Sequence, residues 1–159
     1  LQPMVTGIDD YVATVAAGVA RLRAATGEAP LVVAHSMGGL AVRAWLAEGG
    51  HDDEVHTVVT LGTPHHGCRL ARYALSINAR QMSLGSPWLR ALAEREARVG
   101  PRVPYVCCWS ECDNVVMPPL AARLVDAEHR QIAGAGHLTM VYAPAVYALV
   151  QRLLAAPAR

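Results

Sequence analysis

The chain has 159 residues with a formal net charge of +1; 53% of its residues are hydrophobic and 17% are charged. This length is typical of one domain, so we expect a single domain over residues 1–159. Its fourteen cationic residues are scattered arginines, which excludes a basic nucleic-acid-binding face, and no apolar run reaches the roughly 18 residues of a membrane span.

The first third of the chain predicts two helices on either side of a short buried strand. Residues Ile8–Ala25 place apolar side chains at helical spacing. The run Leu31–Ala34 (LVVA) is too short for a helix and contains no polar residue, as is typical of a strand covered on both faces. Gly38–Glu48 then predicts a second helix.

Three further strands and two further helices are predicted in the rest of the chain. The strands are expected at Val55–Leu61, at Val103–Trp109 and, more weakly, at Glu128–Ala133. A helix should begin at Pro87 after Ser86 and run to about Ala97, and a last helix should span Pro144–Leu154. Strands that alternate with helices predict an α/β fold with a mainly parallel sheet of about four strands flanked by helices.

Ser36 follows the first predicted strand directly and precedes a helix. Ligands of open parallel sheets bind at the carboxyl ends of the strands, so this position suits a reacting group. A sharp turn at Ser36 needs small neighbours, and Ala34, Gly38 and Gly39 meet this need. The turn would also direct the Met37 amide and the positive end of the helix toward a developing oxyanion.

The stretch AHSMGG resembles the nucleophile elbow of bacterial lipases and esterases of the α/β-hydrolase fold, with alanine in place of the first glycine of G-x-S-x-G. The resemblance implies Ser36 as the nucleophile. Asp113 in WSECDNVVMP and His137 in GAGHLTM lie at positions similar to the acid and histidine loops of these lipases. Asp126 is the alternative acid, and a helix-capping serine without chemistry is the alternative interpretation of Ser36.

Two more segments are similar to parts of the same lipases. TLGTPHHG resembles their TPHxG loop, which implies that His65 and His66 line the substrate pocket. QMSLGSPWLRAL resembles the segment that comes after this loop, and it adds Trp88 as a substrate-binding candidate. Residues 68–101 would then form a short cap-like insertion over the pocket. No cofactor is implied, and the histidine spacing does not indicate a metal site.

The chain also departs from this family. Its members begin with several strands before the elbow and carry a His-Gly loop that supplies a second oxyanion amide, whereas the thirty residues before Leu31 are mostly predicted helix. We therefore expect a truncated relative whose Ser36-bearing strand exposes an apolar edge, at which a second copy could pair to form a homo-oligomer. No signal peptide is expected, and both secreted and cytoplasmic locations stay open.

The four cysteines show no paired C-x-x-C spacing. We expect buried thiols, with adjacent Cys107 and Cys108 on opposite faces of a strand, and a Cys68–Cys112 disulfide as the alternative.

The expected function is that of a serine carboxylester hydrolase, a lipase or esterase that hydrolyses a small-molecule ester or lipid through an acyl-enzyme on Ser36. Two alternatives stay open. One is a catalytically impaired remnant or interaction module that keeps the elbow as a packing device. The other is an acyltransferase that passes the acyl group to an alcohol or thiol. Acyl chain length and the choice between lipase and esterase are not determined by the sequence.

Overall fold

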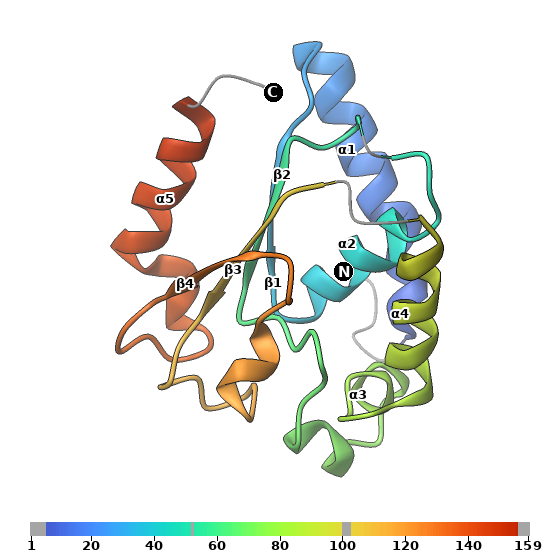
Figure 1. Cartoon of the computed structure of the whole chain (residues 1–159), viewed down its shortest axis with the longest axis vertical. Helices are drawn as coiled ribbons and strands as arrows, with labels where there is room; N and C mark the ends of the chain where they lie inside the picture. Colours follow the sequence, from blue (N-terminus) through green and yellow to red (C-terminus); the bar gives the residue numbers. More distant parts are fainter. Residues whose placement is uncertain (1–5, 52, 100–102, 156–159) are drawn as a thin grey trace.

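Four parallel strands form one sheet in the computed structural model, which describes residues 6–51, 53–99 and 103–155 (Figure 1). The strands, β1 (Leu31–His35), β2 (Thr57–Leu61), β3 (Tyr105–Trp109) and β4 (Glu128–Gln131), lie side by side in chain order. The predicted α/β fold with a parallel sheet of four strands is confirmed. β2 and β3 begin later than predicted, since the residues before them belong to the connecting loops.

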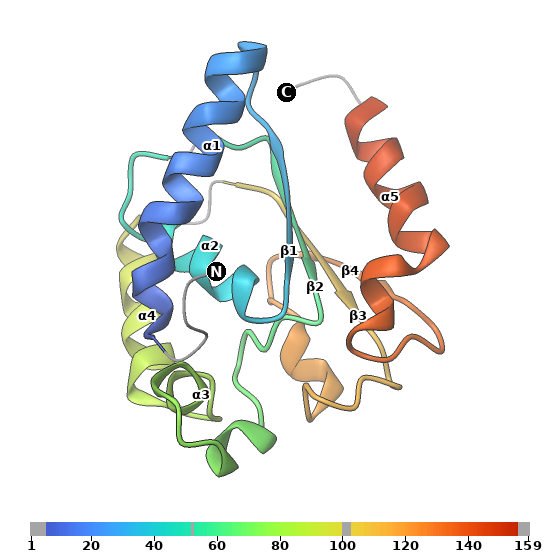
Figure 2. The same ribbon diagram turned by 180° about the vertical axis from the view of Figure 1, so that it is seen from behind.

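Helices cover both faces of the sheet (Figures 1 and 2). One face carries α1 (Val12–Thr26), α2 (Met37–Leu46) and α4 (Pro87–Val99), and the other carries α5 (Pro144–Ala155). The remaining elements are short: α3 (Ile77–Gln81) and the 3-10 turns η1 (Ile8–Tyr11), η2 (Leu70–Tyr73), η3 (Pro119–Ala122) and η4 (Thr139–Tyr142). Of these, η1 begins the predicted helix Ile8–Ala25, which α1 continues. The other short elements were not predicted, because four or five residues are too few to show a helical period.

The core has one layer on each side of the sheet. Val58 packs with Trp45 of α2 and Val19 of α1, whereas its neighbour Val59 packs with Val146 and Leu149 of α5. Successive side chains of a strand point to opposite faces, so a strand covered on both sides must be apolar throughout. This explains the unbroken apolar runs in the sequence.

The cysteines of β3 show the same alternation. Cys108 belongs to the α5 side of the core, and Cys107 lies near the ring of His65 on the other side. The prediction of opposite faces is confirmed. All four thiols are free, with Cys112 exposed and the other three buried, so the Cys68–Cys112 disulfide is not formed.

Strand β1 forms an edge of the sheet, because among the described residues it pairs with β2 alone. Val33, at its centre, is exposed. The predicted apolar edge is therefore present, while pairing with a second copy stays a prediction. Within the described ranges, no helix is long and apolar enough to cross a membrane.

The segment expected to form a cap divides into two parts. Helix α4 joins the helical layer, since its Leu92 packs against Ala44 and the neighbouring Ala47. By contrast, η2 and α3 lie beyond the carboxyl ends of the strands (Figure 1). The last two residues of the predicted cap, 100 and 101, fall outside the described residues. Whether η2 and α3 act as a cap stays a prediction.

Candidate active site

Ser36 occupies the turn between β1 and α2 in a strained backbone conformation. Its φ of 53° and ψ of −127° make it the one non-glycine residue with positive φ in the part of the chain that the structure describes. Such strain gathers at functional sites. A Cβ on Gly39 would lie 2.2 Å from Thr63 Oγ1, whereas a Cβ on Gly38 would meet Ala34 at 4.0 Å. The close approach of α2 to the Thr63 loop therefore requires glycine at position 39.

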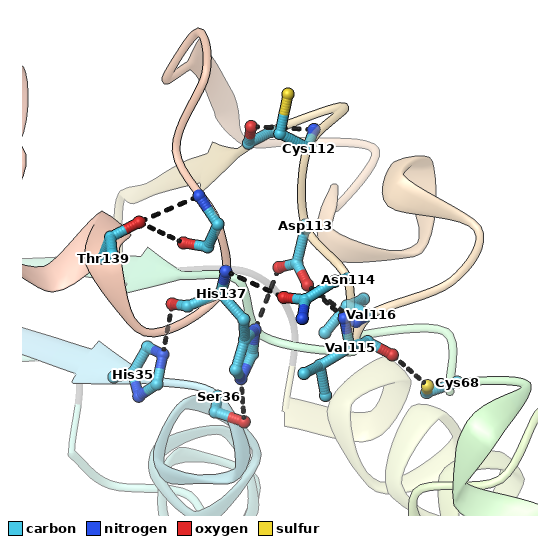
Figure 3. A network of polar contacts seen from close by, with 12 residues as sticks. His35, Ser36, Cys68, Cys112, Asp113, Asn114, Val115, Val116, His137 and Thr139 are labelled. Carbon is cyan, nitrogen blue, oxygen red and sulfur yellow. Dashed lines mark hydrogen bonds and ion pairs between the residues drawn. The ribbon is translucent and has the colours of Figure 1, made fainter.

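Three side chains from distant parts of the sequence form one chain of hydrogen bonds at this turn (Figure 3). His137 Nε2 lies 3.0 Å from Ser36 Oγ, and His137 Nδ1 lies 2.9 Å from Asp113 Oδ2. His137 and Asp113 are buried, and Ser36 is half-buried. The structure thus brings together the serine, base and acid that the sequence indicated, in the arrangement of a hydrolase triad.

Asp113 is held on its other oxygen by the backbone of its own loop. Val115 and Val116 each donate an amide hydrogen bond of 2.8 Å to Asp113 Oδ1. Burial raises the pKa of the Asp113 carboxyl, but the hydrogen bonds from His137 and these two amides outweigh it and bring that pKa below its usual value. Asp113 is therefore ionised at neutral pH and can fix the Nδ1–H tautomer of His137.

His35 supports the loop that carries His137. Its Nε2 lies 3.0 Å from the carbonyl oxygen of His137, and the centroids of the two rings are 4.6 Å apart. Burial lowers the pKa of His35, so the ring is neutral and donates from Nε2. Because His35 precedes Ser36 and points the opposite way from it, the sequence predicts a role for His35 in packing or hydrogen bonding under the elbow. The structure shows that this hydrogen bond reaches the backbone of His137.

Gly62 is a site residue that sequence reasoning missed. It directly follows β2 and has a φ of +54°. A Cβ there would lie 2.9 Å from Asp113 Oδ2 and 3.1 Å from His137 Nδ1. Any side chain would therefore collide with the acid–base pair. A glycine directly after a strand, at the end of the sheet where Ser36 also lies, was the signal that could have found it.

The predicted oxyanion donor, the Met37 amide, lies at the start of α2. Met37 is the first residue of α2, and Ser36 is its N-cap. The first amides of a helix have no partner within the helix, and the helix dipole adds positive potential there. The role of the Met37 amide stays a prediction, as does the source of a second donor.

The structure does not bring His65 to an open surface. The side chain is 2% exposed, with Nε2 3.0 Å from Thr60 Oγ1. Arg43 Nη1 donates to the His65 carbonyl at 2.9 Å, and the same guanidinium pairs with Glu96 at 2.7 Å. Burial, together with the nearby Arg43 and His66, lowers the pKa of His65 well below its usual value. His65 thus anchors its loop to α2 as a neutral ring, and substrate binding by His65 stays a prediction.

The other predicted pocket residues have partners outside the triad. His66 and the alternative acid Asp126 line a cavity of about 370 Å³ that also includes Tyr105 at the start of β3, whereas Ser36 follows the end of β1. The acid that His137 contacts is Asp113 and not Asp126.

Trp88 packs against the helical layer, and its Nε1 donates to Asp9 Oδ2 at 2.6 Å. Substrate binding by His66 or Trp88 stays a prediction.

Comparison with known proteins identifies both a family and a fold. Residues 11–142 match the family described as PGAP1-like alpha/beta domain. Protein SERAC1 of Danio rerio is 30% identical over an alignment of 135 residues, and the match covers 74% of this chain and 20% of that protein. Protein SERAC1 of Homo sapiens is 36% identical over an alignment of 91 residues, and the match covers 46% of this chain and 14% of that protein. The chain therefore spans a fifth or less of the length of these relatives.

Solved structures of lipases share the architecture. The mature form of Bacillus licheniformis lipase BlEst2 superposes with a TM-score of 0.81 at 18% identity, over 94% of this chain and 75% of that one. Aspergillus fumigatus lipase B gives a TM-score of 0.79 at 18% identity, over 92% of this chain and 41% of that one. The resemblance drawn from the sequence is confirmed at the level of the fold: the chain belongs to the PGAP1-like alpha/beta domain family and has the α/β-hydrolase fold of lipases and esterases.

Proposed function

We propose that this chain is a serine carboxylester hydrolase that forms an acyl-enzyme on Ser36. The observation that carries the proposal is the continuous hydrogen-bonded chain from Ser36 Oγ through His137 to Asp113, with distances of 3.0 and 2.9 Å. A nucleophile in contact with a base, which is itself oriented by an ionised acid, is the arrangement that acyl transfer requires. The strained turn at Ser36 supports the same role.

The first half of the proposed reaction acylates the enzyme. Ser36 Oγ attacks the ester carbonyl carbon while His137 Nε2 accepts the hydroxyl proton. The carbonyl π electrons move to the oxygen, and the Met37 amide donates to the resulting oxyanion. When the tetrahedral intermediate collapses, the bond to the alcohol oxygen breaks and His137 returns the proton to the departing alcohol. Asp113 stays ionised and stabilises the imidazolium that forms between these steps.

The second half releases the acid. A water molecule attacks the acyl carbon, His137 accepts a proton from it, and collapse of the second intermediate returns that proton to Ser36 Oγ. An alcohol acceptor in place of water would give acyl transfer by the same steps. His35 takes no part in bond changes. Its hydrogen bond to the His137 carbonyl holds the loop, so that Nε2 stays within reach of Ser36.

Hydrolysis of a short p-nitrophenyl ester tests this function. The 159-residue chain should release p-nitrophenol, and Ser36→Ala should lose nearly all of this activity while it remains folded. Ser83→Ala is the matched control, because the Ser83 hydroxyl donates to the Ala79 carbonyl instead of joining the triad. Retained hydrolysis in Ser36→Ala would reject the assignment of the nucleophile.

A fluorophosphonate probe separates an impaired enzyme from an inactive remnant. Because the probe reacts with an activated serine and needs no turnover, it should label the unmodified chain and Ser83→Ala but not Ser36→Ala. If the folded chain neither hydrolyses the ester nor takes the label, the remnant or interaction module becomes the better explanation. Loss of one oxyanion donor would slow turnover by about 10²–10³-fold and still permit labelling.

A further inference from the structure

The segment between the Thr63 loop and α4 exposes several large apolar side chains. Leu70 and Tyr73 on η2, Leu75 in the following turn, and Ile77 at the start of α3 all lie on the surface, with Leu75 87% exposed. Single exposed apolar residues are common on proteins, but a contiguous group marks an interaction site. The position and charge of this group indicate what it binds.

The exposed group continues onto the loop that carries Asp113. The Arg69 amide, next to Leu70, donates to the Met117 carbonyl at 2.9 Å. Cys68 Sγ donates to the Val115 carbonyl at 2.8 Å. Val115 and Met117 are themselves exposed. We call this surface the apolar rim, and it consists of Leu70, Tyr73, Leu75, Ile77, Val115 and Met117.

The apolar rim borders the triad. Val115 and the exposed Leu138 line a cavity of about 380 Å³ together with His137. Val115 is also the residue whose amide holds Asp113. In Figure 1, the green η2 turn lies at the lower end of the molecule, beyond the carboxyl ends of the strands. Ser36, Asp113 and His137 come after the carboxyl ends of β1, β3 and β4. A flat surface that contacted the rim would therefore lie at the same end of the sheet as the cavity beside His137.

The charge around the rim is positive. Arg69, Arg72 and Arg80 are exposed, and no aspartate or glutamate occurs between Glu54 and Glu94. The Arg72 guanidinium lies 4.6 Å from the ring centroid of Tyr73, so cation and aromatic face are presented together.

The acidic residues near this end do not cancel that charge. Asp9 already accepts from Trp88 at 2.6 Å and pairs with Arg95 at 3.3 Å. Asp10 accepts the Gly7 amide at 2.8 Å. Exposed Glu111 precedes Asp113 in the acid loop, whereas Val115 and Met117 of the rim follow it. The rim therefore combines exposed apolar side chains with arginines that lack carboxylates in their own segment.

We propose that the apolar rim and its three arginines dock this chain on an anionic lipid bilayer, so that Ser36 acts on esters of bilayer lipids. Apolar side chains enter the boundary between headgroups and acyl chains, and arginines lie at the lipid phosphates with their stems along the apolar surface. The hydrolysis of docked lipid rests on the proposed esterase function. Docking through the rim indicates the substrate class of that function, namely acyl esters presented at an anionic surface.

A second copy fits the rim less well than a bilayer does. Two rims that met face to face would bring two sets of Arg69, Arg72 and Arg80 together, and like charges repel across such an interface. An anionic surface matches the apolar side chains and the arginines at once.

Vesicle co-sedimentation tests the proposal. The protein carries Ser36→Ala, so that the lipid stays intact and binding is measured independently of hydrolysis. Vesicles of phosphatidylcholine alone are compared with vesicles that also contain phosphatidylglycerol. We expect binding to the anionic vesicles, weakened by salt, and little binding to the zwitterionic ones.

Two pairs of variants locate the docking surface. Leu75→Asp should weaken binding by about ten-fold or more, because the apolar insertion is lost. Val125→Asp is the matched control: Val125 is 86% exposed, against 87% for Leu75, but precedes β4 at the other end of the sheet. Arg72→Gln should weaken binding about five-fold, whereas Arg152→Gln on α5 should not. Circular dichroism confirms that each variant is folded.

Three results would overturn the proposal: no binding to anionic vesicles, equal binding to both vesicle types, or the same loss in Leu75→Asp and Val125→Asp. If light scattering detects a dimer that the Leu75→Asp substitution dissociates, and the chain does not bind vesicles, the rim is instead a contact surface for a second copy. None of these results bears on hydrolysis of the soluble p-nitrophenyl ester, so failure of docking and failure of the esterase function can be told apart.

Discussion

The two glycines after Ser36 offer a sharp test of how the elbow is built. Both lie in the first turn of α2, yet a Cβ on Gly39 would lie 2.2, 2.8 and 2.9 Å from the side-chain atoms of Thr63, whereas a Cβ on Gly38 would meet the single Ala34 atom at 4.0 Å. Alanine is favoured over glycine in a helix by about 0.5–1 kcal/mol. Gly38→Ala should therefore be neutral or slightly stabilising.

Gly39→Ala should destabilise the chain. Overpacking of a filled site costs about 1–3 kcal/mol, and the Thr63 side chain is fully buried and cannot move into solvent. The difference in unfolding free energy between the two variants should be about 1–3 kcal/mol, which is the overpacking cost alone, because the helix gain applies to both. For a chain of this size that corresponds to roughly 2–12 °C in Tm.

Urea denaturation of the two variants, with Tm by circular dichroism, measures this difference. Thr63→Gly removes all three contacting atoms and should recover most of the loss in a double variant, giving a favourable coupling energy of about 1–3 kcal/mol. If Gly39→Ala and Gly38→Ala unfold alike, or if Thr63→Gly gives no recovery, the close approach of α2 to the Thr63 loop does not explain the glycine.

Two further predictions concern the acid and the thiols. Asp113→Asn should lower kcat/KM by about 10⁴-fold. Because the folded-state pKa of Asp113 is lowered, its contribution to stability is present above the unfolded pKa of about 3.9 and is lost as pH falls through the folded value. The difference in unfolding free energy between the unmodified chain and Asp113→Asn should therefore decrease below about pH 4. A difference that does not change with pH in acid denaturation curves would contradict the hydrogen-bonded carboxylate. Ellman's reagent should modify exposed Cys112 rapidly and the other three thiols only after unfolding, since burial also raises the pKa of Cys107 and brings that of Cys108 to about 12. Rapid reaction of a second thiol in the folded chain would show that the core opens.

Much of the fold could be predicted because it depends on local spacing. An unbroken apolar run of four or five residues does not have the spacing of an amphipathic helix. Such runs, separated by segments with helical spacing of apolar residues, indicate a parallel sheet that is covered on both faces. The same local reasoning located the turn at Ser36, since a strand that meets a helix through small residues has few conformations open to it. Elements of four or five residues, such as η2 and α3, gave no periodic signal and were missed.

The sequence by itself therefore determined the α/β class, the position of Ser36 at the end of a strand, and the order of serine, acid and histidine along the chain. Only the tertiary structure decided which acid meets His137, because Asp113 and Asp126 are both loop residues and the choice depends on which end of the sheet each loop reaches.

The structure also placed His65 in the core and brought His35 and Gly62 to the triad. His137 meets Ser36 across 101 positions of sequence. A contact at that separation depends on the parallel register of four strands, which no local pattern encodes.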